Sequence, residues 1–390
     1  MKKIAAFFTA FAIFLVVIAV FHFSLSGDLK MNNKEFSTWY SPYKDLSCNA
    51  ISQNMHKDTM LVFGSSEFRH GRKTPYHPVN IFKKQNIDLM LVGGPYNQSL
   101  NHAITLGAVG NSIQKKKVVL VVSPTWFYRK GVDKDKYALR FSEGNYIAFM
   151  QNEKIPLSVK KYVAQRSESL LSKNASMQSK VMLYDKVLVN SNNNPLLGLM
   201  YKVRSAYVRD KDIITVKGVL KTTKIRKNKY FNDKVRDPKP INWNLLSDQA
   251  AYSLKNMSHN RFLMSDHFWK KTFGKRLVSA RGLHNDEDFK QSPEYDDLDC
   301  FLKVCKAENV KPMLLILPLN GRWYDYTGLT ANKRATFVKK IEKYGKEYNA
   351  EVVDFSKYDY TPYMVSDAVH PWGKGWVKID EKIYNFYNQI

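Results

Sequence analysis

Residues 59–67 read Thr-Met-Leu-Val-Phe-Gly-Ser-Ser-Glu, a short apolar run that passes directly into a small polar turn. Runs of this kind, rich in β-branched and aromatic residues and bounded by turn formers, are typical of buried parallel strands. Similar runs recur at residues 89–92, 118–122, 313–317 and 351–354. Segments with helical periodicity alternate with them, at residues 99–115, 296–308, 331–348 and 374–388. This alternation predicts an α/β fold with a mostly parallel sheet flanked by helices.

One connection in this pattern is much longer than the others. Residues 129–295 contain no apolar run of comparable strength, and they are rich in Asn, Ser and Lys. A helical pattern occurs at residues 157–172, and residues 190–195 have the composition of a loop. Because an ordinary crossover between parallel strands is far shorter, we predict that residues 129–295 form a helical insertion covering one end of the sheet.

The N-terminus has the composition of a membrane segment. Residues 4–23 are almost wholly apolar, interrupted only by Thr9 and His22. About 20 helical residues cross a hydrocarbon core. A cleaved signal peptide usually has a shorter apolar region and a small-residue exit, which the Ser-Leu-Ser at residues 24–26 matches poorly. We therefore favour one uncleaved transmembrane helix over a cleaved signal.

Flanking charges predict the orientation of this helix. Lys2 and Lys3 favour a cytoplasmic N-terminus by the positive-inside rule, although Lys30 and Lys34 on the other flank weaken the contrast. We expect a single-pass protein of the cell membrane whose body is extracellular. Its expected parts are a membrane anchor at residues 1–28, a stalk at residues 29–56 and a catalytic domain at residues 57–390.

The charge balance indicates an anionic partner. The chain has 61 Lys+Arg against 35 Asp+Glu, a formal charge of +26, and its 44% hydrophobic content excludes disorder as the main state. Outside a membrane, such a domain meets anionic lipids or cell-wall polyphosphates rather than nucleic acid. The densest basic cluster contains Lys224, Arg226, Lys227 and Lys229. Charge pattern alone fits a solvated loop as well as a polyanion-binding surface.

Metal and cofactor motifs are missing from the sequence. The three cysteines, Cys48, Cys300 and Cys305, form neither a disulfide framework nor a zinc pattern. The histidines lack ligand spacing, and no nucleotide-binding glycine motif is present. We therefore expect no metal and no cofactor.

A candidate nucleophile follows the first strand. In open α/β sheets, functional groups collect at the carboxyl ends of the strands, which is where Gly64-Ser65-Ser66 is expected. Helix capping explains such a turn equally well when it is considered alone. Near the C-terminus, Asp367 precedes His370 by three residues, a spacing at which a carboxylate can hold an imidazole in one tautomer. Without a matching nucleophile, His370 would be interpreted as an ordinary surface histidine.

The other candidate bases are weaker than His370. His70 and His77 have no acid at a comparable spacing, and His102 lies within a predicted helix. Turns after the second and third strands contain Gly94 and Ser123, and each can bring donors to the same sheet edge, as an oxyanion hole requires. Ordinary turn chemistry explains each of these turns separately. Their joint occurrence with the Asp-x-x-His pattern favours a site.

The ordered set of motifs resembles the DltD family of D-alanyl-lipoteichoic acid biosynthesis proteins of Gram-positive bacteria. The resemblance covers nearly the whole chain and includes the N-terminal anchor. Its motifs are Gly64-Ser65-Ser66-Glu67, Ser123-Pro124-Thr125-Trp126-Phe127, Pro318-Leu319-Asn320-Gly321-Arg322-Trp323-Tyr324 and Asp367-Ala368-Val369-His370-Pro371-Trp372-Gly373-Lys374-Gly375-Trp376. The family fold resembles that of SGNH hydrolases.

The resemblance implies Ser66 as nucleophile, His370 as base and Asp367 as its orienting acid. In the SGNH pattern the nucleophile is the third residue of Gly-Asp-Ser, which selects Ser66 over Ser65. This chain departs from the pattern because it lacks that aspartate and the asparagine block, so Gly94 and Ser123 stand as provisional oxyanion donors. Family membership further implies D-alanine transfer to lipoteichoic acid outside the membrane, alongside the membrane O-acyltransferase DltB, the carrier protein DltC and the peptide DltX.

Three functions fit these expectations. The first is a membrane-anchored serine acyltransferase that modifies teichoic acid. The second is a thioesterase or esterase that uses the same residues but passes the acyl group to water. The third is a non-catalytic scaffold that presents the polymer to an acyltransferase partner.

Overall fold

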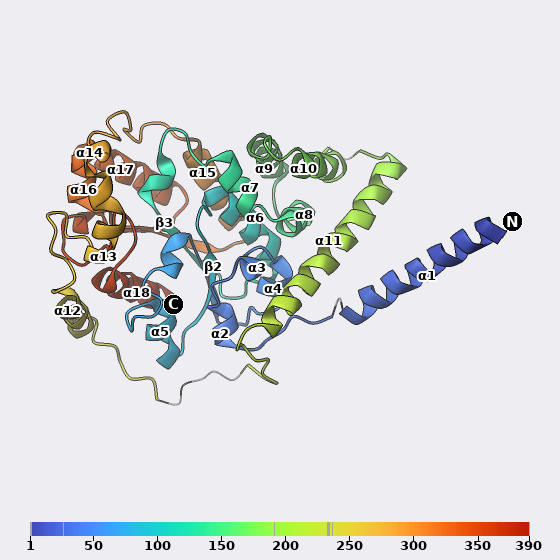
Figure 1. The fold of residues 1–390 in the computed structure, drawn as a ribbon, viewed down its shortest axis with the longest axis horizontal. Helices are drawn as coiled ribbons and strands as arrows, with labels where there is room; N and C mark the ends of the chain where they lie inside the picture. Colours follow the sequence, from blue (N-terminus) through green and yellow to red (C-terminus); the bar gives the residue numbers. More distant parts are fainter. Residues whose placement is uncertain (1, 26, 191, 232–234, 236, 390) are drawn as a thin grey trace.

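The structure is a computed structural model that describes residues 2–25, 27–190, 192–231, 235 and 237–389 (Figure 1). One sheet of five parallel strands has the order β2-β1-β3-β4-β5. The strands are β1 Thr59–Gly64, β2 Asp88–Gly93, β3 Lys117–Val122, β4 Lys311–Ile316 and β5 Glu351–Asp354. The predicted α/β fold with a parallel sheet is therefore confirmed.

Strand order creates a switch point beside β1. β2 pairs with one edge of β1, ending at Gly64↔Gly93, and β3 pairs with the other edge, through Phe63↔Leu120. The chain winds in opposite directions on the two sides of this point, and in open α/β sheets the loops at such a point are where ligands bind. Ser66 lies two residues beyond the end of β1, at the carboxyl edge of the sheet.

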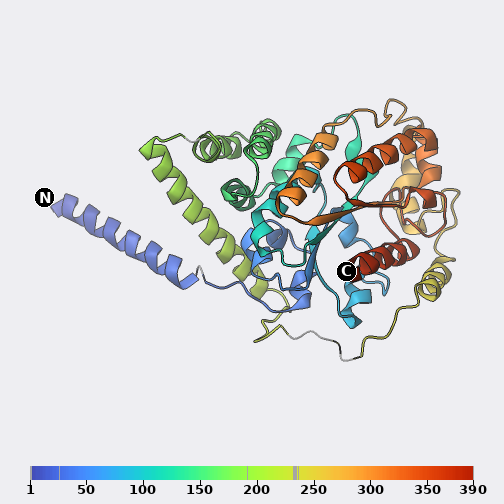
Figure 2. The same cartoon turned by 180° about the vertical axis from the view of Figure 1, so that it is seen from behind.

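Alternating strand residues build two cores, one on each face of the sheet (Figure 2). On one face, Phe63 and Leu120 pack with helices α6 (Ser99–Val109), α15 (Pro293–Ala307) and α17 (Ala331–Glu347). On the other face, Val62 and Val119 pack with α18 (Gly373–Asn388). α18 has an apolar stripe at helical spacing, made of Trp376, Ile379, Ile383 and Phe386.

The long connection between β3 and α15 is helical, and its described residues contain no strand. Its helices are α7 (Lys134–Arg140), α8 (Glu143–Gln151), α9 (Leu157–Leu170), α10 (Ala175–Leu188), α11 (Pro195–Lys221), α12 (Trp243–Leu254), α13 (Asp266–Phe268) and α14 (Leu277–Ala280). α8 packs on α6, whereas α12 packs on α18. The insertion therefore reaches both faces of the sheet rather than covering one end only.

The segment expected as a stalk, residues 29–56, packs on the domain. It forms the short helices α2 (Lys34–Ser37), α3 (Pro42–Asp45) and α4 (Cys48–Ser52). The buried Lys44 ammonium donates to the carbonyl of Leu91 at 2.6 Å, and the Asp45 carboxylate accepts from the N–H of Gly93 at 3.2 Å. Both partners lie on the free edge of β2, so α3 supplies hydrogen-bond partners to backbone groups that β2 does not pair with another strand. The segment predicted to be a stalk therefore contacts the sheet through α3.

Helix α1 (Lys2–Leu25) projects away from the rest of the molecule in both views (Figures 1 and 2). Residues 2–20 have a mean hydropathy of 2.5, and none of this stretch is buried. Length and composition therefore suffice to cross a membrane, a test that signal sequences also pass. The helix is compatible with a single-pass anchor.

Candidate active site

Two glycines shape the turn that presents Ser66. A Cβ on Gly93 would lie 2.2 Å from the carbonyl oxygen of Gly64, and a Cβ on Gly64 would lie 2.4 Å from Oε1 of Glu67. Glycine at residue 93 lets β2 approach the backbone of Gly64 closely, and glycine at residue 64 leaves room for the Glu67 side chain under the 3₁₀ turn η1 (Ser66–Arg69). The hydroxyl of Ser65 has a different partner, because it donates to the carbonyl of Gly94 at 3.1 Å.

His370 lies in a tight loop just before α18. An antiparallel bridge pairs Val365 with Pro371 at the base of this loop. The Asp367 Oδ1 atom accepts from the backbone N–H groups of Val369 at 2.8 Å and His370 at 2.9 Å. These local hydrogen bonds fix the carboxylate relative to the imidazole that follows three residues later.

The structure brings Ser66, His370 and Asp367 into one hydrogen-bonded chain. The Ser66 hydroxyl lies 2.8 Å from Nε2 of His370, and Nδ1 of His370 lies 2.7 Å from Oδ2 of Asp367. An ionised Asp367 can only accept, so Nδ1 carries the proton and Nε2 accepts from the serine hydroxyl. This arrangement is able to remove the Ser66 proton when its oxygen attacks a carbonyl carbon.

Opposing effects set the pKa values of the two titratable members. Burial acts to raise the pKa of Asp367, but the hydrogen bond and charge of His370, with two backbone N–H groups, bring it below its usual value. Burial acts to lower the pKa of His370, but the hydrogen bond and charge of Asp367, with the charge of Glu67, bring it above its usual value. Asp367 thus stays ionised and stabilises the imidazolium that forms during proton transfer.

His70 contacts the triad, which its sequence spacing does not indicate. Its ring stacks on that of His370, with centroids 3.6 Å apart and planes within 5°. Burial, followed by the charge of His370, lowers the pKa of His70 to about 4. His70 is therefore neutral near pH 7 and presents an uncharged aromatic face to the protonated His370 ring.

His70, Asp367 and His370 have possible metal-ligand atoms within 4.8 Å of one another. These distances are short enough for one metal ion to contact all three residues. The parallel rings direct their nitrogen lone pairs along parallel planes rather than to one point. Both ring nitrogens of His370 are already hydrogen-bonded, to Ser66 and to Asp367. The geometry suits proton transfer better than tetrahedral coordination.

Glu67 is a second residue whose role sequence reasoning missed. Its side chain is buried beneath the Ser65-Ser66 turn, and its Oε1 accepts the N–H of Ser65 at 2.6 Å. Burial raises the pKa of Glu67 to about 6. A carboxyl group next to the candidate serine is a signal present in the sequence, but only the structure shows that it holds the turn.

The two provisional oxyanion residues lie at the same sheet edge. Gly94 is joined to the serine turn through Ser65, but its carbonyl accepts from both Ser65 and the N–H of Asn97. Ser123 follows β3, and its hydroxyl pairs with that of Thr125 at 2.9 Å. Their role as oxyanion donors stays a prediction.

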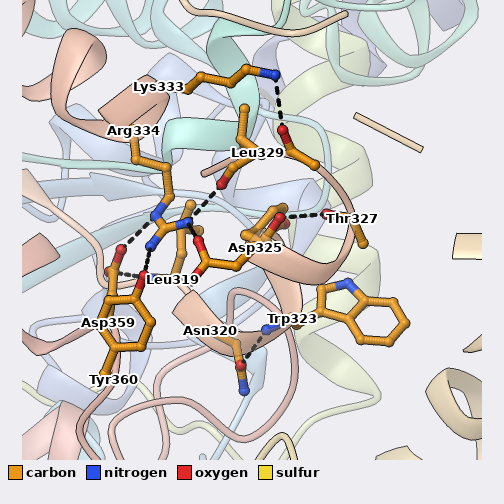
Figure 3. Close-up of polar contacts among 12 residues, drawn as sticks. Leu319, Asn320, Trp323, Asp325, Thr327, Leu329, Lys333, Arg334, Asp359 and Tyr360 are labelled. Atoms are coloured by element: carbon orange, nitrogen blue, oxygen red, sulfur yellow. Dashed lines mark hydrogen bonds and ion pairs between the residues drawn. The ribbon is translucent and has the colours of Figure 1, made fainter. Parts of the chain in front are cut away.

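An ion network centred on the buried Arg334 (Figure 3) is connected to the loop that bears His370. Arg334 on α17 pairs with Asp359 at 2.8 Å and Asp325 at 2.9 Å. Asp359 in turn accepts the N–H of Leu319, and the N–H of the adjacent Asn320 donates to the carbonyl of Ala368 at 2.9 Å. The network therefore connects α17 to the segment between Asp367 and His370.

The predicted basic cluster lies elsewhere in the molecule. Lys224, Arg226, Lys227 and Lys229 are exposed in the segment that follows α11. Lys227 pairs with Asp28 at 2.6 Å, and the carbonyl of Arg226 accepts from Asn33. The cluster thus lies beside residues 28–33, near the start of the domain, and the structure does not bring it into the triad.

A cavity of about 670 Å³ adjoins the β2 side of the sheet, lined by Trp39, Phe82 and Leu89 among others. None of the three triad residues lines it. The cavity therefore does not coincide with the hydrogen-bonded group of Ser66, His370 and Asp367.

The parallel sheet and the Ser-His-Asp group at its carboxyl edge define an SGNH-hydrolase-like α/β protein. A family model described as DltD protein matches residues 33–388. The chain therefore belongs to the DltD family, which confirms the resemblance found in its motifs.

Individual relatives cover most of the chain. Protein DltD of Bacillus subtilis (strain 168) is 30% identical over 388 residues, which is 97% of this chain and 95% of that protein. Protein DltD of Staphylococcus aureus (strain NCTC 8325 / PS 47) is 25% identical over 329 residues, or 83% and 79% of the two chains. Protein DltD of Lacticaseibacillus rhamnosus is 23% identical over 341 residues, or 86% and 79%.

Proposed function

We propose that this protein takes part in the D-alanylation of teichoic acid as a membrane-anchored serine acyltransferase on the outer face of the membrane. Membership of the DltD family implies involvement in D-alanylation and an enzymatic or esterase-like role. The observation that carries the finer proposal is the chain of hydrogen bonds from Ser66 through His370 to Asp367.

The proposed acylation begins when Ser66 Oγ attacks the carbonyl carbon of a D-alanyl thioester or ester. His370 Nε2 takes the hydroxyl proton, and Asp367 stabilises the resulting imidazolium. When the tetrahedral intermediate collapses, the bond to the leaving sulfur or oxygen breaks, and His370 returns the proton to that atom. Ser66 then carries the D-alanyl group as an ester.

The second half of the reaction reverses these roles. A polyol hydroxyl of teichoic acid attacks the acyl-serine carbonyl, and His370 Nε2 takes the hydroxyl proton. Collapse of the second intermediate breaks the bond to Ser66 Oγ, which regains a proton from His370. The product is a D-alanyl ester of the polymer, and the enzyme returns to its starting state.

Partners and acceptor follow from the same proposal. Lipoteichoic acid is the expected acceptor, and the basic cluster of Lys224, Arg226, Lys227 and Lys229 is proposed to attract its phosphates. A DltB-type O-acyltransferase, the DltC carrier and the DltX peptide are the partners that the family suggests. Since DltC is cytosolic, an outward-facing domain would receive D-alanine only after it has crossed the membrane.

A hydrolytic function is the main alternative, because water competes with the polyol for the same acyl-serine. A non-catalytic scaffold is the third possibility. It requires no hydrogen bond between Ser66 and His370, whereas the structure has one at 2.8 Å.

The test combines a variant with mass measurement. Ser66→Ala should abolish D-alanylation and the alanyl adduct that intact-protein mass spectrometry detects on the wild-type protein, because no other hydroxyl donates to His370 Nε2 in the described residues. Ser65→Ala is the matched control, since its hydroxyl donates only to Gly94 and the variant should keep the adduct. Full activity in a folded Ser66→Ala protein would leave the scaffold function as the explanation.

A further inference from the structure

Helix α11 has an apolar face that no other described part of the chain covers. It is 27 residues long, and its first half presents five large apolar side chains that are 49–64% exposed. Their spacing of three, one, three and four residues places them on one helical face. This apolar stripe consists of Leu196, Leu199, Met200, Val203 and Tyr207.

The opposite side of the same helix is packed into the domain. Tyr201 and Val208 are buried in the core that also includes α8 and α10. Arg204 pairs with the carboxylate of Glu143 on α8 at 2.9 Å. α11 is therefore held firmly in place, and its exposed stripe is a fixed surface feature rather than a frayed end.

The charged residues of α11 that precede Asp210 are all cationic. Residues 195–209 contain Lys202, Arg204 and Arg209 but no Asp or Glu. An apolar stripe flanked by cations is typical of helices that lie against anionic lipid, where long basic side chains reach the headgroups and tyrosine lies at the interface. The first acidic residue of α11, Asp210, follows the stripe and is paired with His22 of α1.

Contacts with α1 show which face of α11 lies toward the proposed membrane anchor. His22, near the end of α1, pairs with Asp210 on α11 at 2.5 Å. Asp210 follows Val203 by seven residues and Tyr207 by three, so it lies on the face that bears the stripe. The face that meets the anchor helix is thus the same face that presents the apolar side chains.

A second contact gives the direction in which α1 runs relative to α11. The Lys217 ammonium lies 3.7 Å from the position of a Cβ on Gly27. The two contacts, residue 27 with residue 217 and residue 22 with residue 210, occur in the same order along both segments. The end of α1 and this part of α11 therefore run in the same direction. Toward its N-terminus, α1 enters the proposed membrane. In the same direction, the first half of α11 extends about 20 Å beyond Asp210, at 1.5 Å per residue. Both views show the start of α11 on the side from which α1 projects (Figures 1 and 2).

We infer that the apolar stripe of α11 is a second membrane contact, which inserts into the outer leaflet of an anionic bilayer. Its occupant is lipid, because the stripe continues the face that meets the anchor and is bordered by cations. This contact fixes the rotation of the domain about α1, which a single spanning helix cannot do. The lipid contact is independent of the chemistry proposed for Ser66.

The experiment uses the full chain in nanodiscs of mixed phosphatidylglycerol and phosphatidylcholine. Leu199→Cys and Val203→Cys, each in a Cys48→Ser background, are labelled with an environment-sensitive fluorophore, while Cys300 and Cys305 are buried. The matched control is Tyr252→Cys on α12, a side chain that is 72% exposed. Quenching is measured with nitroxide groups on the lipid acyl chains and with aqueous iodide.

Labels on the stripe should be quenched several-fold more strongly by the lipid nitroxide than by iodide, and the Tyr252 label should show the reverse. Equal iodide quenching at all three positions would overturn the inference. Protection that appears only in native membranes, and not in pure-lipid nanodiscs, would also overturn it by assigning the stripe to a protein partner. Both measurements read the position of the helix and remain informative if Ser66 proves non-catalytic.

Discussion

Among single residues, Asp367 has the clearest control over the chemistry proposed here. His370 must be neutral to accept the Ser66 proton, and Asp367 raises the pKa of His370 above its usual value of 6.5. Activity should therefore rise with pH through a midpoint above 6.5. Below that midpoint His370 is already protonated and cannot act as a base.

Asp367→Asn should change this profile in a predictable direction. Without the carboxylate, burial dominates and lowers the pKa of His370, so the midpoint of the acidic limb should move below 6.5. Turnover at the optimum should fall by about 10⁴-fold, because an amide can hold the wrong tautomer. The rate of D-alanyl ester turnover from pH 5 to 9 measures both effects. An unchanged midpoint would contradict the assignment of Asp367.

The local part of this site could be predicted from the sequence and the distant part could not. Ser66 follows a strand directly, and Asp367 and His370 are three residues apart, so each signal lies within a few residues. His70 meets His370 across 300 positions of sequence, and only the fold determines that their rings stack. His70 has no acid nearby in the sequence, which argued against a role as base. In the structure, its ring lies against the face of the His370 imidazole.

At the scale of elements, the ion network of Arg334 connects α17 to the loop that bears His370. Arg334 and Asp359 are 4% and 5% exposed, so removing one partner leaves a charge without compensation in a buried place. The sheet and its helices were predictable because their patterns repeat over many residues. The helices of residues 34–52 were not, because four or five residues show no periodicity and their burial depends on the free edge of β2.

Arg334→Met should lower the free energy of unfolding by about 3–5 kcal/mol, the usual cost of breaking a buried pair. Lys173→Met is the control, since Lys173 and Asp135 form an exposed pair and its loss should leave stability unchanged. Chemical denaturation followed by circular dichroism measures both variants. Equal stability of the two variants would mean that the Arg334 network does not hold the loop.

At the scale of the whole molecule, the excess of positive charge should strengthen binding of an anionic polymer without changing the rate of the reaction at Ser66. The cluster of Lys224, Arg226, Lys227 and Lys229 lies beside the start of the domain, away from the triad. Long polyanions can contact both places at once, whereas a small ester reaches only Ser66. Charge removal should therefore separate polymer binding from turnover of a small substrate.

Replacing all four cations of the cluster with glutamine should weaken teichoic acid binding and flatten its salt dependence, because fewer counterions are released. Hydrolysis of a small neutral acyl ester should be unchanged. An equal loss of charge on another exposed segment is the control, with Lys270, Lys271, Lys275 and Arg276 replaced. Loss of binding in the control alone would move the acceptor site to that segment.

Topology is the second property of the whole molecule that an experiment can decide. Protease added to intact protoplasts should remove the domain and leave a short protected N-terminal fragment, because α1 is long and apolar enough to span. Immunoblots against tags at both ends follow the two products. Protection of the entire chain would place the domain in the cytoplasm and favour a thioesterase that acts on the carrier protein.

If α1 spans the membrane with the domain outside, as proposed, the packing of residues 29–56 onto the sheet also limits how far the domain can reach from the bilayer. Only residues 26–28 separate the end of α1 from the buried Leu29, and three residues span at most about 10 Å. On so short a tether, the carboxyl edge of the sheet samples a thin layer above the bilayer and cannot follow a polymer outward through the wall. Repeat units farther along each chain would have to be brought to the enzyme by motion of the polymer, so the spacing of modified units would report polymer dynamics rather than enzyme movement.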